Sequence, residues 1–174
     1  DGTATTSPYD YTSTTGTVIL PMLTFAGTAG ETQTLQLGAV ADNTVEADET
    51  FTIGMKSLVN TTLSANIDIT SVATYTILNA DTASVTIEDI FGNEDNGVIT
   101  VTARLDNSVQ GGFSVDVGTT DNTATLADSD YTAVTGQTLT FVGFMGESQR
   151  FSITPTAETK MEAEETLKIS LFNV

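Results

Sequence analysis

The chain repeats itself, and the repeat sets the size of the unit that folds. Residues 1–16, DGTATTSPYDYTSTTG, return as residues 121–136, DNTATLADSDYTAVTG, with nine of the 16 positions identical. A second matching pair, residues 25–53 and 141–169, follows at an offset of 116 instead of 120 residues. Internal repetition defines the folding unit, and this period is the size of one domain. The sequence therefore predicts two related units.

Composition excludes several classes of function. The 174 residues contain neither cysteine nor histidine, which removes disulfides, thiolate chemistry, and the commonest general base and zinc ligand. A formal net charge of −18 repels phosphate backbones and anionic membrane surfaces, so we expect no nucleic-acid binding. No apolar run approaches the ~18 residues of a membrane span, so we also expect no membrane insertion.

Alternation of apolar and polar residues predicts β-strands along most of the chain. Every second side chain is apolar in residues 97–105, and again in residues 113–117 after the Gly111-Gly112 turn. We expect these two strands to pair as a hairpin. Residues 63–69 and 72–78 predict another hairpin, and Val85 to Ile87 predict the strand that closes the first unit.

Short strands separated by turns about every 8 to 14 residues indicate a sandwich of two antiparallel sheets. The predicted fold class is therefore all-β, with tandem immunoglobulin-like antiparallel β-sandwiches. A helical interpretation is confined to VEADET, residues 45–50, and MEAEET, residues 161–166. Both are too short to be stable alone, so we predict acidic loops there.

Four motifs occur in the same order in both halves or at their junction. They are the DGTAT segment followed by DYT and Gly, the Gly-Glu turn (Gly30-Glu31 and Gly146-Glu147), the acidic stretch ADNTVEADETF, and the strand SVTIED. A new unit then opens with an acidic residue and glycine, Glu94 to Gly97. In these motifs the chain resembles the Calx-beta domain family over nearly its whole length.

The resemblance implies that each copy is incomplete. The first copy lacks two opening strands that residues 94–120 supply in the second, and the second lacks the closing strand that Val85 to Ile87 supply in the first. We therefore expect units at 1–90 and 91–174, cut from a longer array. We also expect either a continuing polypeptide or a neighbouring chain to pair with the exposed strand edges.

The resemblance further implies calcium ligands, because Calx-beta domains that bind calcium have acidic residues at matching positions. Carboxylate-rich loops suit Ca²⁺, which takes six to eight oxygen ligands. Departures from the family pattern are Ala41 in place of an acidic residue and the interruption of the acids after residue 89 by Ile90 and Phe91. In the first copy the matching residues are Asp10, Asp42, Glu46, Glu49 and Asp89.

The second copy has a corresponding acidic set, with Lys160 among its members. That lysine offsets part of the negative field, so we expect the second site to be the weaker one. The matching residues are Glu94, Asp130, Glu158, Glu162 and Glu165.

Simpler roles are open for the same residues. Charged runs usually form solvated surface, and an aspartate at a turn, such as Asp10 or Asp130, commonly caps backbone amides. Tyr11 and Tyr131 fit the edge of a core, with their hydroxyls on nearby backbone groups, better than a ligand platform.

Together these features predict a structural and adhesive function without enzymatic activity. Bacterial proteins with such repeats are commonly large secreted or surface-anchored adhesins, including gliding types, so the resemblance implies an extracellular stalk segment with calcium rigidifying the joints. Its partners would be neighbouring repeats and an unknown surface ligand. One alternative is a calcium-sensing regulatory module. Another is a carbohydrate-binding module, although the chain has no tryptophan.

Overall fold

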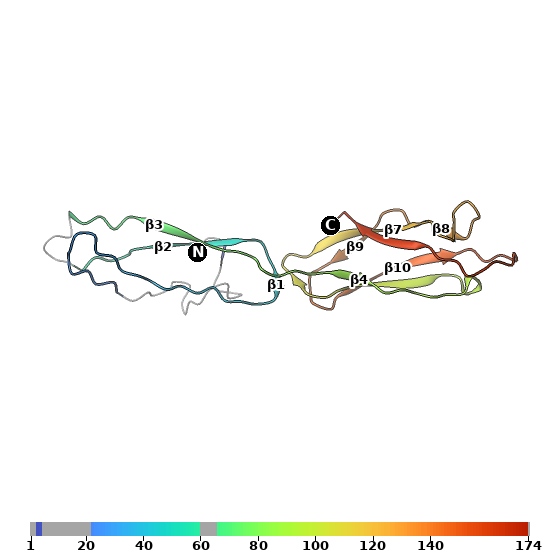
Figure 1. The fold of residues 1–174 in the computed structure, drawn as a ribbon, viewed down its shortest axis with the longest axis horizontal. Helices are drawn as coiled ribbons and strands as arrows, with labels where there is room; N and C mark the ends of the chain where they lie inside the picture. The colour runs from blue at the N-terminus through green and yellow to red at the C-terminus, as the bar shows by residue number, and fades with distance from the viewer. Residues whose placement is uncertain (1–2, 5–21, 60–65, 174) are drawn as a thin grey trace. The chain divides into compact units, whose positions relative to one another are not determined.

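The computed structural model describes residues 3–4, 22–59 and 66–173 and is all-β, with antiparallel sheets apart from one two-residue parallel pair, which confirms the predicted fold class (Figure 1). Contacts divide the chain into two compact units, one of Asp1–Asp42 with Ala47–Ala80 and one of Asn43–Glu46 with Asp81–Val174. Among the described residues, no helix has the length and hydrophobicity of a bilayer span. The strands are β1 (Thr44–Val45), β2 (Glu49–Gly54), β3 (Val72–Ile77), β4 (Val85–Ile87), β5 (Ile99–Leu105), β6 (Ser108–Val109), β7 (Phe113–Thr120), β8 (Tyr131–Thr132), β9 (Gln137–Phe141), β10 (Ser148–Pro155) and β11 (Lys168–Phe172), with a short 3-10 helix η2 (Glu94–Asn96) before β5.

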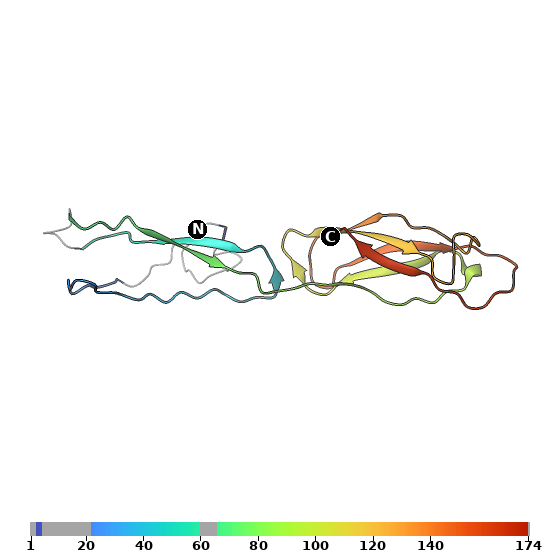
Figure 2. The same ribbon diagram turned by 45° about the horizontal axis from the view of Figure 1, so that its top comes forward.

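The second unit is a sandwich of two sheets, which Figures 1 and 2 show from two directions. One sheet has the strand order β4-β5-β10-β8 and the other β11-β7-β9. Each sheet turns its apolar face toward the other, as sandwiches require. The buried core between them consists of Val101, Ala103, Leu105, Val115, Val117, Leu139, Phe141, Phe151 and Ile153.

Strand β5 shows how the sequence builds this core. Val101, Ala103 and Leu105 are fully buried, whereas the residues between them are exposed. This burial confirms the alternation predicted for residues 97–105. Burying each valine or leucine contributes roughly 1.5–3 kcal/mol, so the pattern determines which face of the strand turns inward.

The predicted hairpin between residues 97–105 and 113–117 is wrong. Strand β5 pairs with β4 and β10, whereas β7 pairs with β9 and β11 in the opposite sheet. Both strands have a strongly apolar face, so they bury these faces across the core instead of lying side by side. The chain crosses between the sheets through β6 and the two glycines at residues 111 and 112, which have positive φ.

Strand β4 lies in a different place from the one expected. Its residues, expected to close the first unit, pair antiparallel with β5 and pack against the second core. The Ser84 N–H donates to the Asp106 carboxylate at 2.7 Å, and the Asp106 N–H donates to the Ser84 carbonyl at 3.1 Å. These bonds fasten the strand to the end of β5.

The described part of the first unit contains the antiparallel pair β2 and β3, with Phe51 opposite Tyr75. Their ring centroids lie 5.2 Å apart, and Phe51 is buried together with Ala4. Among the described residues the hairpin predicted between residues 63–69 and 72–78 is not seen, because residues 66–69 form no strand and β3 pairs with β2. Residues 60–65 lie outside the described residues.

The sequence repeat is also a repeat of hydrogen bonds. The Ala4 N–H donates to the Thr50 carbonyl at 3.0 Å, and the Ala124 N–H donates to the Thr166 carbonyl at 3.0 Å. In return the Thr50 N–H donates to Thr3 Oγ1, and the Thr166 N–H donates to Thr123 Oγ1, both at 2.7 Å. Equivalent residues of the two copies therefore occupy equivalent positions beside their strands.

The Gly-Glu turn of both copies has the same physical basis. The Glu147 carboxylate accepts the N–H groups of Val142 and Gly143 at 3.0 and 2.9 Å. Glu31 accepts the equivalent pair, Ala26 and Gly27, at 2.9 and 3.0 Å. These hydrogen bonds lower the pKa of both carboxyl groups, and the largest effect comes from Ala26 on Glu31 and from Val142 on Glu147. In both copies the glutamate therefore closes the turn by capping two consecutive amides, and in the second copy this turn directly precedes β10.

Gly143 allows a close backbone approach, which generates a prediction. A Cβ atom there would lie 2.0 Å from the Val109 carbonyl oxygen, at φ 105°. We expect Gly143→Ala to destabilise the chain by about 2–4 kcal/mol, combining steric overlap with an unfavourable φ. Urea unfolding measures the loss.

Gly136→Ala is the matched control, because Gly136 also has a positive φ but has no atom within 4 Å of a Cβ at that position. It should cost only the conformational part, about 1–2 kcal/mol. Equal losses for the two variants would contradict the close contact.

Candidate functional site

Residues 121–131, here called the DYT loop, form a folded structure with its own hydrogen bonds. The Tyr131 hydroxyl donates to Asp121 Oδ1 at 2.6 Å, and the Leu126 N–H donates to the same oxygen at 3.2 Å. Tyr131 is 4% exposed, so it belongs to the core, as predicted, but its hydroxyl binds a carboxylate instead of a backbone group. The aspartate and tyrosine of the repeated motif thus tie the two ends of the loop together.

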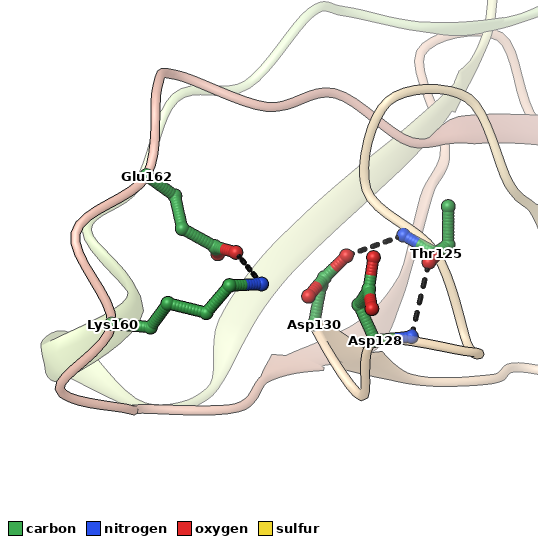
Figure 3. Close-up of polar contacts among 5 residues, drawn as sticks. All are labelled: Thr125, Asp128, Asp130, Lys160 and Glu162. Carbon is green, nitrogen blue, oxygen red and sulfur yellow. Dashed lines mark hydrogen bonds and ion pairs between the residues drawn. The ribbon is translucent and has the colours of Figure 1, made fainter.

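The Asp130 side chain binds the backbone of the same loop (Figure 3). Its Oδ2 accepts the Thr125 N–H at 2.6 Å, and the Thr125 Oγ1 accepts the Asp128 N–H at 3.1 Å. The capping role considered for Asp130 is therefore confirmed for one oxygen. The other, Oδ1, is buried and accepts no hydrogen bond from the described residues.

Residues 157–166, here called the acidic loop, lie outside the strands and include residues 161–166, where a loop was predicted. The loop predicted at residues 45–50 is only partly correct, because Val45 belongs to β1 and β2 begins at Glu49. The acidic loop brings Glu158 and Glu162 to Asp130, and one carboxylate oxygen from each of the three lies within 4.8 Å of the others. Glu158 Oε1 is also buried and without a hydrogen-bond partner among the described residues. Two unpartnered carboxylate oxygens thus belong to one small cluster, which we call the acidic cluster.

The remaining predicted acids of the second copy act on this cluster electrostatically. The neighbouring Glu162 carboxylate raises the pKa of Glu158, with loss of water contact and Glu94 adding to the shift. Partial loss of water contact and the Asp130 carboxylate raise the pKa of Glu165. All five acids predicted from the sequence are therefore coupled in one region, which is strongly negative.

Lys160 is the cation within this negative region. Its ammonium group forms an ion pair with Glu162 Oε1 (Figure 3), and this contact lowers the pKa of Glu162. Glu162 in turn raises the pKa of Lys160, with Asp128 contributing. The lysine side chain is 58% exposed, so this ion pair is screened by water and contributes little to stability.

The acids predicted as ligands in the first copy do not form a comparable cluster among the described residues. Asp10, like Tyr11, lies outside the described residues. Asp42 and Glu49 belong to the first compact unit and Glu46 to the second, where the Gln110 side-chain amide donates to it at 3.1 Å. Asp89 is exposed after β4. Among the described residues, the acidic cluster of the second copy is the group of three carboxylates with metal-binding spacing.

Sequence reasoning did not identify the residues that position Asp130. Thr125 holds its Oδ2, and Asp121 anchors the loop to the core through Tyr131. The repeated motif DNTATLADSDYT contains all three, so the repeat itself was the available signal. Periodicity could not assign them, because their contacts lie within one irregular loop.

The donor set of the acidic cluster fits a hard divalent cation. Carboxylate oxygens are the ligands that Ca²⁺ prefers, and flexible loops suit its variable coordination. The unpartnered oxygens of Asp130 and Glu158 are the direct observation in favour of this fit. The hydrogen bond between the Glu158 and Glu162 side chains is the main cause of the raised pKa of Glu158, and loss of water contact and the negative charge of Glu162 add to it.

The raised pKa of Glu158 predicts a pH dependence of stability. A carboxyl group with a raised folded-state pKa stabilises the fold below its unfolded value of 4.5, and this stability is lost as pH rises through the folded pKa. We expect Glu158→Gln to remove this loss and raise the thermal unfolding midpoint at pH 7 in metal-free buffer. The amide also becomes a donor toward Glu162.

Glu164→Gln is the control, since it removes the same charge from an exposed position on the same loop. It should leave the pH profile between 4.5 and 7 close to that of the wild type. If both variants changed the profile equally, general charge reduction would explain the effect.

One of two comparisons with known proteins finds a match. A search of curated proteins finds no match to the chain. The sequence profile of the Calx-beta domain matches residues 1–89 and again residues 79–174. The overlap of the two matches includes β4, which the structure places beside β5. The two matches together cover the whole sequence, and the chain therefore belongs to the Calx-beta domain family.

Proposed function

We propose that this chain is a structural repeat segment of a secreted or surface-anchored adhesin, in which calcium at the acidic cluster stiffens the loops. Membership of a β-sandwich repeat family, with two successive copies, supports a stalk role. The observation that carries the calcium part is the convergence of Asp130, Glu158 and Glu162, with two unpartnered oxygens.

Calcium would act by joining two loops that otherwise repel each other. Asp130 comes from the DYT loop, and Glu158 and Glu162 come from the acidic loop. A shared divalent ion replaces repulsion between these carboxylates with common ligation. The DYT loop is anchored to the core through Tyr131, so ligation would transmit stiffness from the loops to the sandwich.

The surface charge suits a segment that is repeated many times in one polypeptide. A net charge of −18 without cysteine keeps the segment dispersed and independent of disulfide chemistry. Neighbouring repeats of the same polypeptide are the partners that we propose.

Glu162 and Glu165 lie together on one loop, so they lack the opposed placement that a glycosidase pair needs, and we propose no catalysis.

Thermal unfolding with calcium and with a chelator tests the proposal. Calcium at 100 times its dissociation constant should stabilise the chain by about 2.7 kcal/mol per site. Magnesium should have a smaller effect, because it demands rigid octahedral coordination and dehydrates reluctantly. An unchanged midpoint at millimolar calcium would refute calcium binding.

The Glu158→Gln variant localises the effect to the second copy. It should lose most of the calcium-induced rise in midpoint, although we expect it to be more stable than the wild type without metal. Opposite signs in the two conditions distinguish a ligand from a solvated charge. Glu164→Gln should keep the calcium response, and a variant pair that responded alike would argue against this cluster.

Lys160 generates a separate prediction for calcium affinity. Its ammonium group competes with the metal for Glu162, so Lys160→Met should tighten calcium binding up to about fivefold, a limit set by the screening of exposed charges. Lys160→Arg preserves the charge and should bind calcium like the wild type. Isothermal titration calorimetry measures both, and weaker binding by Lys160→Met would contradict competition.

A further inference from the structure

The outer face of the sheet formed by β4, β5, β10 and β8, here called the arginine face, carries both arginines of the chain. In β5 and β10 the side chains alternate between the core and this outer face. Arg104 lies on the outer face in β5 and Arg150 in β10, and both are exposed. Two guanidinium groups are thus gathered on one sheet face of a chain whose net charge is −18.

The strand register makes the two arginines diagonal neighbours. Arg104 lies opposite Ser148, and Arg150 lies opposite Thr102. Diagonal positions on adjacent antiparallel strands are about 7–8 Å apart, within the reach of long side chains. The Arg104 guanidinium lies beside Gly146, where a Cβ atom would be 3.6 Å from its Nη2, so no side chain at that turn position covers it. One extended ligand can therefore contact both cations.

Neither arginine has a carboxylate partner among the described residues. The chain contains 23 acidic residues, yet none of them occupies an outward position within the four strands of this sheet. The outer face of the other sheet differs, because it carries Asp116, which accepts the Thr138 hydroxyl at 2.6 Å. Both guanidinium groups of the arginine face are therefore available to an external anion.

The first copy indicates that the fold does not require Arg150. The repeat offset of 116 residues maps Arg150 onto Thr34, which is uncharged. The same offset maps Glu147 onto Glu31, and these two glutamates cap equivalent turns. The turn is thus built in the same way with and without an arginine three residues later. Because the Arg150 side chain is also exposed, packing does not explain its presence.

Hydroxyl groups surround the two arginines. Serine and threonine hydroxyls both donate and accept hydrogen bonds, so they suit a ligand that itself has many hydroxyls. None of the outward residues of β4, β5 and β10 is aromatic, which leaves charge and hydrogen bonding, not stacking, to hold a sugar. The outward hydroxyl residues of these three strands are Thr86, Thr100, Thr102, Ser148, Ser152 and Thr154.

We infer that the arginine face binds an acidic polysaccharide whose sugars carry carboxylates. A guanidinium group binds a carboxylate through two parallel N–H···O bonds, and the serine and threonine hydroxyls match those of the sugars. A peptide would instead pair with the main chain of an edge strand, which a sheet face does not offer. At physiological salt, exposed charges more than about 8 Å away are largely screened, so distant acids of the chain repel such a ligand only weakly.

Binding of the 174-residue chain to immobilised polygalacturonate tests the inference. Surface plasmon resonance in chelator excludes bridging by calcium, so the result is independent of the calcium proposal. The chain should bind polygalacturonate and should not bind uncharged dextran, and binding should weaken as the salt concentration rises. Absence of binding to polygalacturonate, or equal binding to dextran, would overturn the inference.

Substitutions of the arginines locate the site. Arg104→Gln and Arg150→Gln should each weaken binding roughly tenfold, the order of magnitude of one lost charge-assisted hydrogen bond. Lys168→Gln is the matched control, because it removes the same charge from an exposed position on the outer face of the other sheet. It should bind like the wild type, and equal weakening by all three variants would show a general charge effect and overturn the site.

Two further measurements test the choice of ligand. Arg150→Lys preserves the charge but loses the bidentate geometry, so its affinity should lie between those of the wild type and Arg150→Gln. Polyaspartate offers carboxylates without sugar hydroxyls and should bind more weakly than polygalacturonate. Polyaspartate binding as tight as that of polygalacturonate would show recognition of an acidic peptide and would overturn the polysaccharide.

Discussion

The second unit depends on one constraint, the burial of two apolar sheet faces against each other. Residues such as Val101 and Val117 come from opposite sheets and are both fully buried. Once these faces are in contact, the loops that connect the strands lie at the two ends of the sandwich. There the backbone N–H groups of the loops need hydrogen-bond acceptors from the loops themselves. Glu147 and Asp121 do this by accepting backbone amides. The rigid core therefore creates the positions that the acidic loops occupy.

The acidic cluster follows from that arrangement. Tyr131 is buried and binds Asp121, so the adjacent Asp130 is held close to the core, while one of its oxygens has no hydrogen-bond partner among the described residues. Glu158 and Glu162 approach from a loop that has no regular structure of its own. One side of the cluster is therefore rigid and the other adaptable, a combination that suits a cation with variable coordination. Lys160 partly neutralises the adaptable side in the absence of metal.

The two copies use equivalent hydrogen bonds for different neighbours. Thr50 and Thr166 bind the same motif on one side of their strands. On the other side, β2 has β3 as its neighbour, whereas β11 is the edge of its sheet. The apolar residues of strand β4 pack against the core of the second unit, which explains why β4 pairs with β5.

Much of this structure was predictable from the sequence. The repeat, the all-β class and the inward face of β5 follow from period-two alternation and from motifs that recur at a fixed offset. The acids of the second copy were named from the resemblance to Calx-beta domains, and the structure brings three of them together, Asp130, Glu158 and Glu162. Alternation specifies which face of a strand is apolar, but it does not determine which other strand lies beside it, because main-chain hydrogen bonding is the same for every strand. Tertiary packing therefore decided that β5 and β7 lie in opposite sheets and that β4 pairs with β5. It also decided that Asp130 uses one oxygen for Thr125 and leaves the other for the cluster, since that choice depends on loop contacts that no periodic pattern encodes.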